Sequence, residues 1–377
     1  MRSTRLIVDC SELKHNIAEF KNLLSPDTQI MAVVKANAYG HGLADIAKHS
    51  LEYGASWLGV ATPEEGVFLR NNGISAPILV LGASNGDELR LCVENELHQT
   101  IFERNQVVEL NNIACEQGKK AYAHIKVNTG MNRIGVSDEH DFELLLNTLK
   151  ACGSVVADGI FTHFACADEE NDQRTFVQIS KFEAMIEKAR QLGFDFKTIH
   201  ACNTAGTLRG LCKNYGLVRL GIGIYGYYPS EYMKTASSAS LHPIAKLVTN
   251  ISAVNTVKSG DEISYGGTFK AQTKMRVATL PVGYADGYSR KLSSVGYVVI
   301  CGKKAQILGR VCMDQLMVDI SGIDEAHIGT EAILMGDGSD VAMTADDIAQ
   351  LCGTVSYEVL TSIAQRVERI YTGTENM

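Results

Sequence analysis

The chain has 377 residues, of which 45% are hydrophobic and 21% charged, and its net charge is −8 with neither sign gathered in a long block. This composition argues against a nucleic-acid-binding protein, and the ten scattered cysteines, with no CxxC pair, argue against a structural zinc site or a disulfide framework. With no signal-peptide core and no apolar run near the ~20 residues of a membrane span, we expect a cytoplasmic protein that binds neither membrane nor metal.

Short apolar runs alternate with amphipathic stretches of helix length along the first part of the chain. Helical spacing is clear in residues 64–71 and 176–192. Alternating strands and helices predict a parallel sheet, and the number of units fits a closed (β/α)8 barrel better than an open doubly wound sheet, which stays the alternative. The expected strands lie at 30–34, 56–60, 77–81, 98–102, 121–127, 157–164, 197–201 and 217–222.

After about residue 235 the pattern changes to strand-like segments separated by glycine-containing turns, with one helix expected near 344–351. We therefore predict a (β/α)8 barrel over residues 1–235 and a mainly-β domain over 236–377, the first ten or so residues being candidates for pairing with the second domain. The expected strand segments of the second domain are 245–257, 275–281, 296–301 and 305–320.

Lys35 is the most informative single residue, because an apolar run ends on it. A lysine is disfavoured at the buried end of a strand unless it is paired, neutralised or covalently used, although its long side chain can also extend into solvent. The segment 34–42 reads VKANAYGHG. We expect Gly40 and Gly42 to let the backbone approach a ligand, and Tyr39 and His41 to add polar groups at the same rim. This pattern favours a covalently bound aldehyde cofactor.

Polar residues recur at the carboxyl ends of the expected strands, where barrel enzymes build their active sites. Any one of them could be a structural residue of the core, as His163 or His200 could be alone. Thr204 and the segment 221–223 offer a hydroxyl and backbone N–H groups suited to a phosphate. The clustered residues are Lys35, Tyr39, Lys126, Arg133, His163, His200, Asn203, Thr204, Arg219, Gly221 and Ile222.

With these residues in place, the segment VKANAYGHG resembles the pyridoxal-phosphate (PLP) attachment motif of the alanine racemase family. Further segments resemble that family in the same order along the chain, so the resemblance covers nearly all of it. They are KVNTGMNRIG at 126–135, HACNTA at 200–205, VRLGI at 218–222, SYGGT at 264–268 and GRVCMD at 309–314.

The resemblance implies a fold-type III PLP enzyme with a barrel, a C-terminal β domain and a head-to-tail homodimer that shares its active sites. Lys35 would form the Schiff base with PLP and serve as one base, and Tyr265 from the other subunit would serve as the second. His163 and Arg219 would relay protons, with His200 supporting Arg219. A guanidinium with a pKa above ~12 would leave the pyridine nitrogen facing it unprotonated.

The resemblance also assigns the substrate contacts. Arg133 would contact the phenolic oxygen of PLP and the substrate carboxylate, the partner's Met313 backbone would hold that carboxylate, and a carbamylated Lys126 would orient Arg133. Cys312 and Asp314 would support the site, and Asn203 belongs to the cofactor-binding set. The implied phosphate contacts are Tyr39, Thr204, Gly221, Ile222 and Tyr357, and the implied entrance residues are Asp168, Tyr284, Arg290 and Arg310.

Two positions depart from the family pattern: Thr204 stands where serine is common, and Asn128 where aspartate is frequent. Neither alters the expected activity, since threonine keeps the hydroxyl. Tyr357 keeps the bulk that narrows the pocket, so we expect alanine as the substrate. Serine stays open as a slower one, because an apolar pocket discriminates weakly against one extra hydroxyl.

Two other functions share some of these features. A fold-type III decarboxylase would share the domains but place an acidic residue where Arg219 stands, and a non-catalytic PLP-binding protein would share the barrel but lack the second base. The resemblance favours racemisation of L- and D-alanine, with D-alanine supplied for peptidoglycan.

Overall fold

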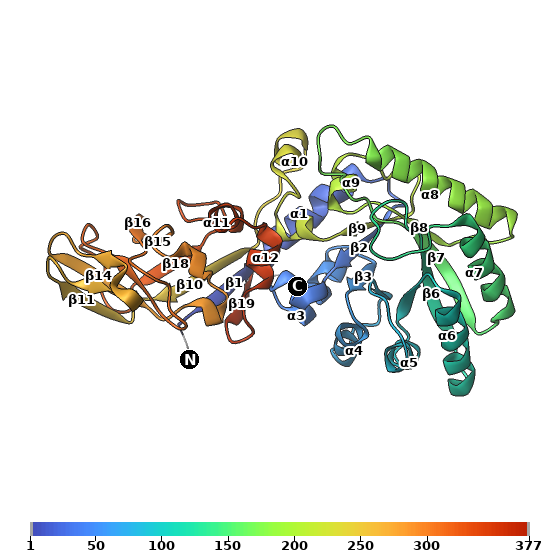
Figure 1. Cartoon of the computed structure of the whole chain (residues 1–377), viewed down its shortest axis with the longest axis horizontal. Helices are drawn as coiled ribbons and strands as arrows, with labels where there is room; N and C mark the ends of the chain where they lie inside the picture. The colour runs from blue at the N-terminus through green and yellow to red at the C-terminus, as the bar shows by residue number, and fades with distance from the viewer. Residues whose placement is uncertain (1–2, 375–377) are drawn as a thin grey trace.

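A computed structural model describes residues 3–374 as an α/β barrel joined to a mainly-β domain, which lie side by side along the long axis of the molecule (Figure 1). Eight parallel strands form the barrel in the order β8-β7-β6-β5-β4-β3-β2-β9. A backbone hydrogen bond of 2.9 Å from the N–H of Arg219 to the carbonyl of Cys202 bridges the remaining edge, so the open-sheet alternative is wrong. The strands are β2 (Gln29–Val33), β3 (Trp57–Val60), β4 (Ile78–Val80), β5 (His98–Ile101), β6 (Ala121–Lys126), β7 (Val155–Phe161), β8 (Thr198–His200) and β9 (Leu217–Leu220).

Helices follow the strands and surround the barrel (Figure 1). The two helices expected at 64–71 and 176–192 are present, α4 beginning at a threonine cap with proline in its first turn. The barrel helices are α1 (Cys10–Leu23), α2 (Lys35–Tyr39), α3 (Leu43–Glu52), α4 (Pro63–Asn71), α5 (Asp87–Glu94), α6 (Arg104–Gln117), α7 (Glu139–Ala151), α8 (Arg174–Gln191), α9 (Thr204–Leu208), η1 (Ile222–Tyr225) and α10 (Glu231–Ala236).

The second domain is built on a six-stranded sheet of order β16-β15-β18-β10-β1-β19, with a three-stranded sheet β11-β14-β17 and a small hairpin beside it. The segments expected at 245–257 and 305–320 each divide into two strands, and a short helix, α12, was not expected. The elements are β10 (Ala245–Asn250), β11 (Ala253–Val257), β12 (Glu262–Ile263), η2 (Tyr265–Gly267), β13 (Phe269–Lys270), β14 (Met275–Leu280), η3 (Tyr284–Asp286), η4 (Arg290–Leu292), β15 (Tyr297–Ile300), β16 (Lys303–Gln306), β17 (Leu316–Asp319), β18 (Glu331–Met335), α11 (Ala345–Cys352), α12 (Ser356–Thr361) and β19 (Glu368–Thr372).

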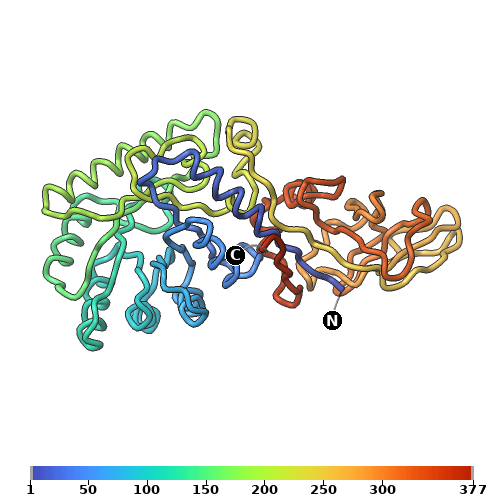
Figure 2. The backbone as a smooth tube through the Cα atoms, turned by 180° about the vertical axis from the view of Figure 1, so that it is seen from behind, coloured from blue at the N-terminus to red at the C-terminus, as the bar shows by residue number. Residues whose placement is uncertain are grey.

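The first strand, β1 (Arg5–Asp9), lies in the sheet of the second domain. It pairs antiparallel with β10 and parallel with β19, so that Arg5 lies opposite Glu368. Seen from behind, the N-terminal segment leaves this sheet and enters the barrel as α1 (Figure 2). The two ends of the chain therefore meet in one sheet, which ties the domains together.

The barrel interior holds both an apolar cluster and buried polar side chains. Met31, Trp57, Leu79, Phe161 and Leu217 form the cluster. His124, His200, Arg219 and Lys126 are buried within the same barrel. No helix in residues 3–374 combines the length and apolarity needed to cross a membrane.

Candidate active site

A cavity of about 880 Å³ lies at the carboxyl ends of the barrel strands, where α12 of the second domain also contributes to its wall. Most of the barrel residues expected from the sequence line it. His200 does not, because it is fully buried behind Arg219. The expected residues in the lining are Lys35, Tyr39, Lys126, Arg133, His163, Asp168, Asn203, Thr204, Arg219, Gly221, Ile222 and Tyr357.

Lys35 lies just after β2, at the rim of this cavity. Residues 36–39 all have positive φ, between 52° and 54°, a conformation that costs roughly 1–2 kcal/mol for each non-glycine residue. The Glu65 carboxylate braces the turn, since its two oxygens accept the backbone N–H groups of Ala36 and Ala61, each at 2.7 Å. This left-handed turn fixes the backbone from which Lys35 projects.

The Lys35 amine is half-buried, and burial lowers its pKa. The Arg133 guanidinium lowers the same pKa further, and Glu65 opposes both effects. A lower pKa raises the fraction of free amine, which is the form that attacks an aldehyde or accepts a proton. No ion pair holds Lys35 in the described part of the chain, so its amine faces the cavity uncommitted.

The two glycines after Lys35 do not make room for a ligand as expected. A Cβ atom on Gly40 would lie 2.1 Å from the Leu360 carbonyl oxygen, and one on Gly42 would lie 1.9 Å from the Tyr371 hydroxyl. Both glycines therefore allow close packing against the second domain. His41 is fully buried, so it is not a polar group of the rim.

Arg219 is a buried side chain of the site that donates to four acceptors. It is only 3% exposed. One terminal nitrogen donates to His200 Nδ1 at 2.8 Å, and the other donates to the carbonyls of Thr162 and Ala201 at 2.8 and 2.9 Å and to His163 Nδ1 at 3.1 Å. These acceptors hold the guanidinium against the cavity wall before any ligand binds.

Burial lowers the pKa of Arg219 to about 10, below the value expected from the sequence. The side chain is still charged at neutral pH. Burial, followed by the nearby Arg219, lowers the pKa of His163 well below its ordinary value, so this imidazole is neutral. His163 accepts from Arg219 through Nδ1, and its proton therefore lies on Nε2.

Lys126 is buried at 5% exposure, with its ammonium nitrogen 4.5 Å from the centre of the Phe161 ring. Burial, then Arg219 and Arg133, lowers its pKa well below the ordinary value. No carboxylate is paired with it within residues 3–374. A charged amine that is buried next to two guanidinium groups is unfavourable, so Lys126 either loses its proton or gains a negatively charged group.

Hydroxyl and backbone N–H groups converge at another side of the cavity. The backbone N–H groups of Gly221 and Gly223 point to the Thr204 hydroxyl oxygen at 3.2 and 3.4 Å. A Cβ atom at Gly221 would lie 2.6 Å from the Tyr39 hydroxyl, so a larger residue there would displace this hydroxyl. The Tyr39 and Tyr357 rings lie 6.1 Å apart. Such a donor-rich wall suits the oxygens of a phosphate.

Apart from Tyr357, the expected site residues of the second domain do not line this cavity. Tyr265, Met313 and Tyr284 are 71%, 53% and 43% exposed. They gather around one loop, because the Ser264 hydroxyl donates to the Arg310 carbonyl at 2.6 Å and the Tyr284 N–H donates to the Cys312 carbonyl at 3.1 Å. Asp314 is paired with Arg366 at 2.7 Å, and Arg290 lies in η4.

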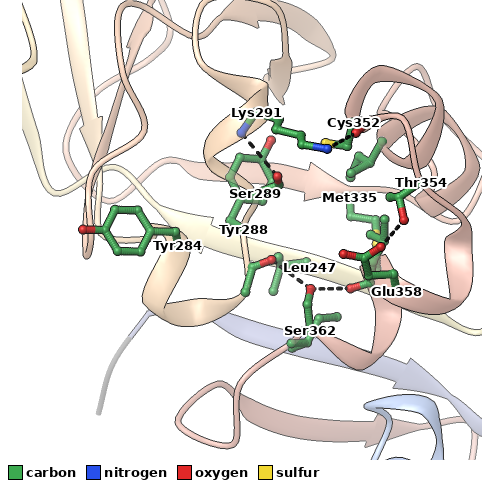
Figure 3. Close-up of a pocket in the computed structure, with 14 residues that line it drawn as sticks. Leu247, Tyr284, Tyr288, Ser289, Lys291, Met335, Cys352, Thr354, Glu358 and Ser362 are labelled. Carbon is green, nitrogen blue, oxygen red and sulfur yellow. Dashed lines mark hydrogen bonds between the residues drawn. The ribbon is translucent and has the colours of Figure 1, made fainter.

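A smaller cavity of about 260 Å³ lies within the second domain, between its sheet and α11 and α12 (Figure 3). Its lining is largely apolar, with Met335 and Ile348 among its walls. Lys291 donates to the Cys352 carbonyl at 2.6 Å, and Thr354 bonds to Glu358. Its charged groups are thus already engaged, unlike Lys35 in the barrel cavity.

Sequence reasoning missed two features of the site. Glu65 follows Thr62 at the spacing of a capping box, which predicts the start of a helix. This spacing does not predict the hydrogen bonds that the Glu65 carboxylate accepts from the turn after β2 and from Ala61. The second feature is the layer beneath the site. Phe161 precedes His163 by two residues, and His124 precedes Lys126 by two, so the alternation of side chains along a strand places each pair on the same inward face. That period could have indicated the residues beneath the site.

Comparisons with known proteins agree with the geometry. The family "Alanine racemase, N-terminal domain" matches residues 8–229, and "Alanine racemase, C-terminal domain" matches residues 244–371. The chain is 42% identical to the alanine racemase of Clostridium perfringens over 366 residues, covering 97% of this chain and 94% of that protein. It is 37% identical to alanine racemase 2 of Bacillus subtilis over 373 residues, covering 98% and 95%.

Two solved structures share the whole fold. Alanine racemase of Clostridium difficile 630 superposes with a TM-score of 0.94 at 35% identity, over 99% of this chain and 96% of that one. Alanine racemase of Bacillus anthracis, solved with bound L-Ala-P, gives a TM-score of 0.93 at 35% identity, over 99% and 96%. Both the decarboxylase and the non-catalytic alternative are therefore wrong. This chain belongs to the alanine racemase family.

Proposed function

We propose that the barrel cavity binds PLP and that the chain uses it to interconvert L- and D-alanine, with residues of two subunits completing each site. The observation that carries this proposal is the pairing, in one cavity, of a free half-buried lysine amine with a buried arginine already held by four acceptors. The family's reaction supplies D-alanine for peptidoglycan. The free state of all ten cysteines fits work in the reducing cytoplasm.

The lining of the cavity suits PLP. Tyr39, Thr204, Gly221, Ile222 and Tyr357 would hold the phosphate through hydroxyl and N–H donors. In addition, Arg219 would face the pyridine nitrogen as a donor, Arg133 the phenolic oxygen, and Asn203 would complete the cofactor-binding set.

Lys35 has two roles in this proposal. Its amine would hold the aldehyde of the cofactor, and the same amine would carry a proton to or from one face of the α-carbon. PLP, when bound, acidifies that proton by withdrawing electrons from the α-carbon. The lowered pKa of Lys35 raises the fraction of its amine that is free to accept a proton.

Racemisation needs a proton group on the opposite face, and the barrel cavity of this chain does not include Tyr265. Because Tyr265 and Met313 are exposed on the second domain, we place them in the site of a neighbouring copy. In a head-to-tail homodimer, Tyr265 of the partner subunit would serve the opposite face and the partner's Met313 would bind the substrate carboxylate. Cys312 and Asp314 would support that loop.

Several residues set the size of the entrance in this proposal. Tyr357 narrows the cavity from α12, and Asp168 lines it from the barrel. Tyr284, Arg290 and Arg310 would be supplied by the second domain. This bulk favours alanine, and serine would react more slowly because its hydroxyl is only weakly rejected.

Lys126 is proposed to carry a carbamate. Its neutral amine would attack CO2 and lose a proton, giving a carboxylate between Arg133 and Arg219 that orients Arg133 by charge. Exchange of the purified enzyme with 13C-bicarbonate should give a carbamate carbon signal that is absent from Lys126→Ala. Equal signals in both proteins would contradict the modification.

Mixing two inactive variants tests the shared site. Lys35→Ala and Tyr265→Phe homodimers, each with damaged sites, are unfolded and refolded together. If the two residues of one site come from different subunits, half of the dimers regain one intact site and activity returns to about a quarter of the wild-type value. No recovery from verified mixed dimers would contradict the shared site.

Incubation with L-alanine or L-serine in deuterated water tests the reaction itself. We expect D-alanine that carries deuterium at the α-carbon, without release of CO2, and a slower reaction of serine. A protein that binds PLP yet exchanges no α-proton would overturn the proposal.

A further inference from the structure

A line of hydrogen-bonded side chains runs from Arg219 through the barrel interior, away from the cavity. Arg219 donates to His200 Nδ1 at 2.8 Å, and His200 Nε2 lies 2.9 Å from His124 Nδ1. These three side chains are at most 3% exposed. The His200 ring stacks on Phe161 with centroids 4.7 Å apart, and the His124 ring lies 5.2 Å from that of Trp57. Aromatic walls therefore shield the line from water.

The direction of each bond in this line follows from its first member. An arginine can only donate, so His200 Nδ1 must accept and the His200 proton must lie on Nε2. His200 then donates to His124 Nδ1, which places the proton of His124 on Nε2. Burial lowers the pKa of His124 to about 3, so this ring is neutral.

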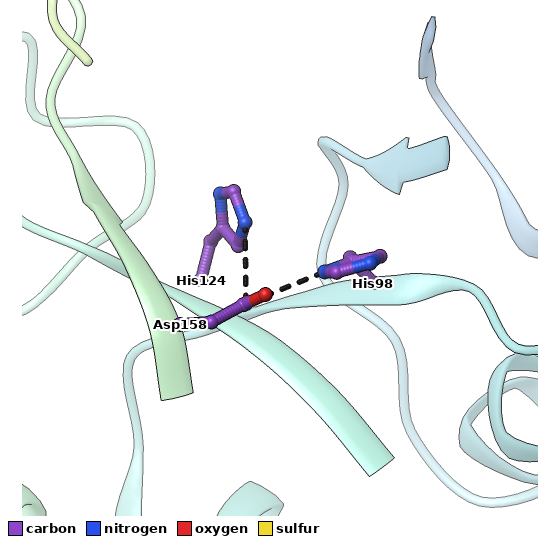
Figure 4. Close-up of side chains that lie close together, drawn as sticks. All are labelled: His98, His124 and Asp158. Carbon is purple, nitrogen blue, oxygen red and sulfur yellow. Dashed lines mark ion pairs between the residues drawn. The ribbon is translucent and has the colours of Figure 1, made fainter. Parts of the chain in front are cut away.

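The proton on His124 Nε2 faces a carboxylate. Asp158 Oδ1 lies 3.5 Å from His124 Nε2 and 3.4 Å from His98 Nδ1 (Figure 4). All three atoms are buried and have no hydrogen-bond partner in the described part of the chain. Asp158 is thus the carboxylate that both imidazoles approach, at ion-pair distances of 3.4 and 3.5 Å.

The backbone is shaped to bring these groups together. The pairing of β6 with β7 shifts register between Ala123 and His124, so that Ala123 lies opposite Ala157 and His124 opposite Gly159, and Asp158 is the extra residue of the bulge. A Cβ atom on Gly159 would lie 2.5 Å from the His124 ring. Both the bulge and the glycine make room for this imidazole beside the carboxylate.

We propose that His124 and Asp158 are positioning residues for Arg219, which act by holding His200 in the one tautomer that accepts from it. Arg219 has no ion pair with a carboxylate within residues 3–374, so Asp158, two imidazoles away, is the negative group aligned with it. The effect on catalysis rests on the proposed function, because it requires Arg219 to face the cofactor.

The same three side chains could also be considered as a cation site, since their ligand atoms lie within 4.8 Å of one another. A cation would need the lone pair of His124 Nε2 and would move that proton to Nδ1. His200 would then have to accept through Nε2 and carry its own proton on Nδ1, facing the donor of Arg219. The observed 2.8 Å contact favours the hydrogen-bonded chain instead.

Nitrogen NMR of the purified holoenzyme, labelled with 15N-histidine, tests the tautomers directly. We expect His200 and His124 to be neutral, each with its proton on Nε2, and their spectra to stay unchanged after one equivalent of Zn²⁺. A proton on Nδ1 of His200 would overturn the proposal, and so would Zn²⁺ binding that is lost in Asp158→Asn.

Kinetics of matched variants test the consequence. Asp158→Asn should lower kcat for alanine by about tenfold or more with little change in KM, and should alter the His200 signals, whereas Asp158→Glu should restore both toward wild type. Glu52→Gln changes a carboxylate that pairs with His49 on α3, away from the line, and should leave both unchanged. Wild-type kcat and His200 signals in Asp158→Asn would overturn the proposal.

Two further results keep the proposals separate. If Asp158→Asn does not fold, the wild-type spectrum still decides the tautomers. If the wild-type protein does not racemise alanine, the proposed function fails, whereas the spectrum continues to test the hydrogen-bonded line.

Discussion

The mouth of the barrel and the loop surface around Tyr265 contribute to the proposed site in opposite ways. In the barrel, Arg219 is buried and its acceptors are all in place, and Lys35 projects from a braced turn. On the second domain, Tyr265 and Met313 are largely exposed. The barrel thus preassembles the groups that would hold the cofactor, whereas in the proposed homodimer the opposite face would be covered by a second copy.

Removal of the lysine should have the largest effect. Lys35→Ala eliminates both the anchor and one proton carrier, so alanine racemisation should fall by about 10⁴-fold or more while the melting temperature stays near that of wild type. The matched control is Lys181→Ala, an exposed lysine of α8, which should keep full activity. Retention of a tenth of the wild-type rate in Lys35→Ala would contradict its role.

Acid should weaken the barrel before the second domain. Burial lowers the pKa of His41 from 6.5 to about 4 and that of His124 to about 3, whereas the one histidine of residues 244–371, His327, is exposed. The unfolded chain binds protons at these positions below pH 6.5, so the free energy of unfolding should fall as pH drops from there toward 4.

The fluorescence of Trp57, the single tryptophan, reports this loss, because its ring lies 5.2 Å from that of His124. Urea unfolding at about pH 7 and about pH 5 should differ by a few kcal/mol, and His41→Phe should reduce the difference. Equal stability at both pH values would show that these imidazoles are not held neutral by the fold.

Two arginine-to-lysine changes, one in the barrel and one on the second domain, should lower the free energy of unfolding by different amounts. Arg219→Lys leaves buried acceptors without donors, so the free energy of unfolding should fall by about 2–3 kcal/mol. Arg310→Lys, on the loop near Tyr265, should change it by less than ~0.5 kcal/mol, because the Arg310 guanidinium donates no hydrogen bond within residues 3–374. If urea unfolding gave the same loss of unfolding free energy for both variants, the barrel site and the loop around Tyr265 would not differ as proposed.

A pair of glycines tests the packing at the junction of the domains. Gly40 and Gly73 have φ of 87° and 83°, but a Cβ atom would touch the Leu360 carbonyl only at Gly40 and meets nothing within 4 Å at Gly73. Gly73→Ala should cost about 1 kcal/mol, and Gly40→Ala about 1–3 kcal/mol more. Similar losses would mean that the domains do not pack tightly there.

The barrel could be predicted because its signal is repetitive. Each apolar run alternates with a helix, and an error of a few residues, as at 157–164 against β7, does not change the topology. The second domain was harder, since the loop around Arg310 interrupts the expected run at 305–320 and α12 has only six residues. Short elements fixed by tertiary contacts carry little local signal.

Site residues could be predicted from the sequence where the residue type itself indicates the chemistry. They could not be predicted where their role depends on tertiary contacts. Lys35 and Arg219 stand out by type, and strand ends place them together. The left-handed turn at 36–39 contains no glycine, so no propensity indicates it, and it depends on Glu65 from another helix. Gly40 likewise allows close packing against Leu360 instead of binding a ligand, and Leu360 is far away in the sequence.

The contacts of β19 with the loop after Lys35 have a consequence for biosynthesis. Arg369 donates to the Gly40 carbonyl at 2.8 and 3.0 Å, and the Tyr371 hydroxyl donates to the His41 carbonyl at 3.0 Å. During translation, the barrel residues leave the ribosome before Arg369 and Tyr371 do. The loop after Lys35 gains its last anchors only when the final strand emerges, so a prematurely terminated product would carry a barrel with an unsecured lysine.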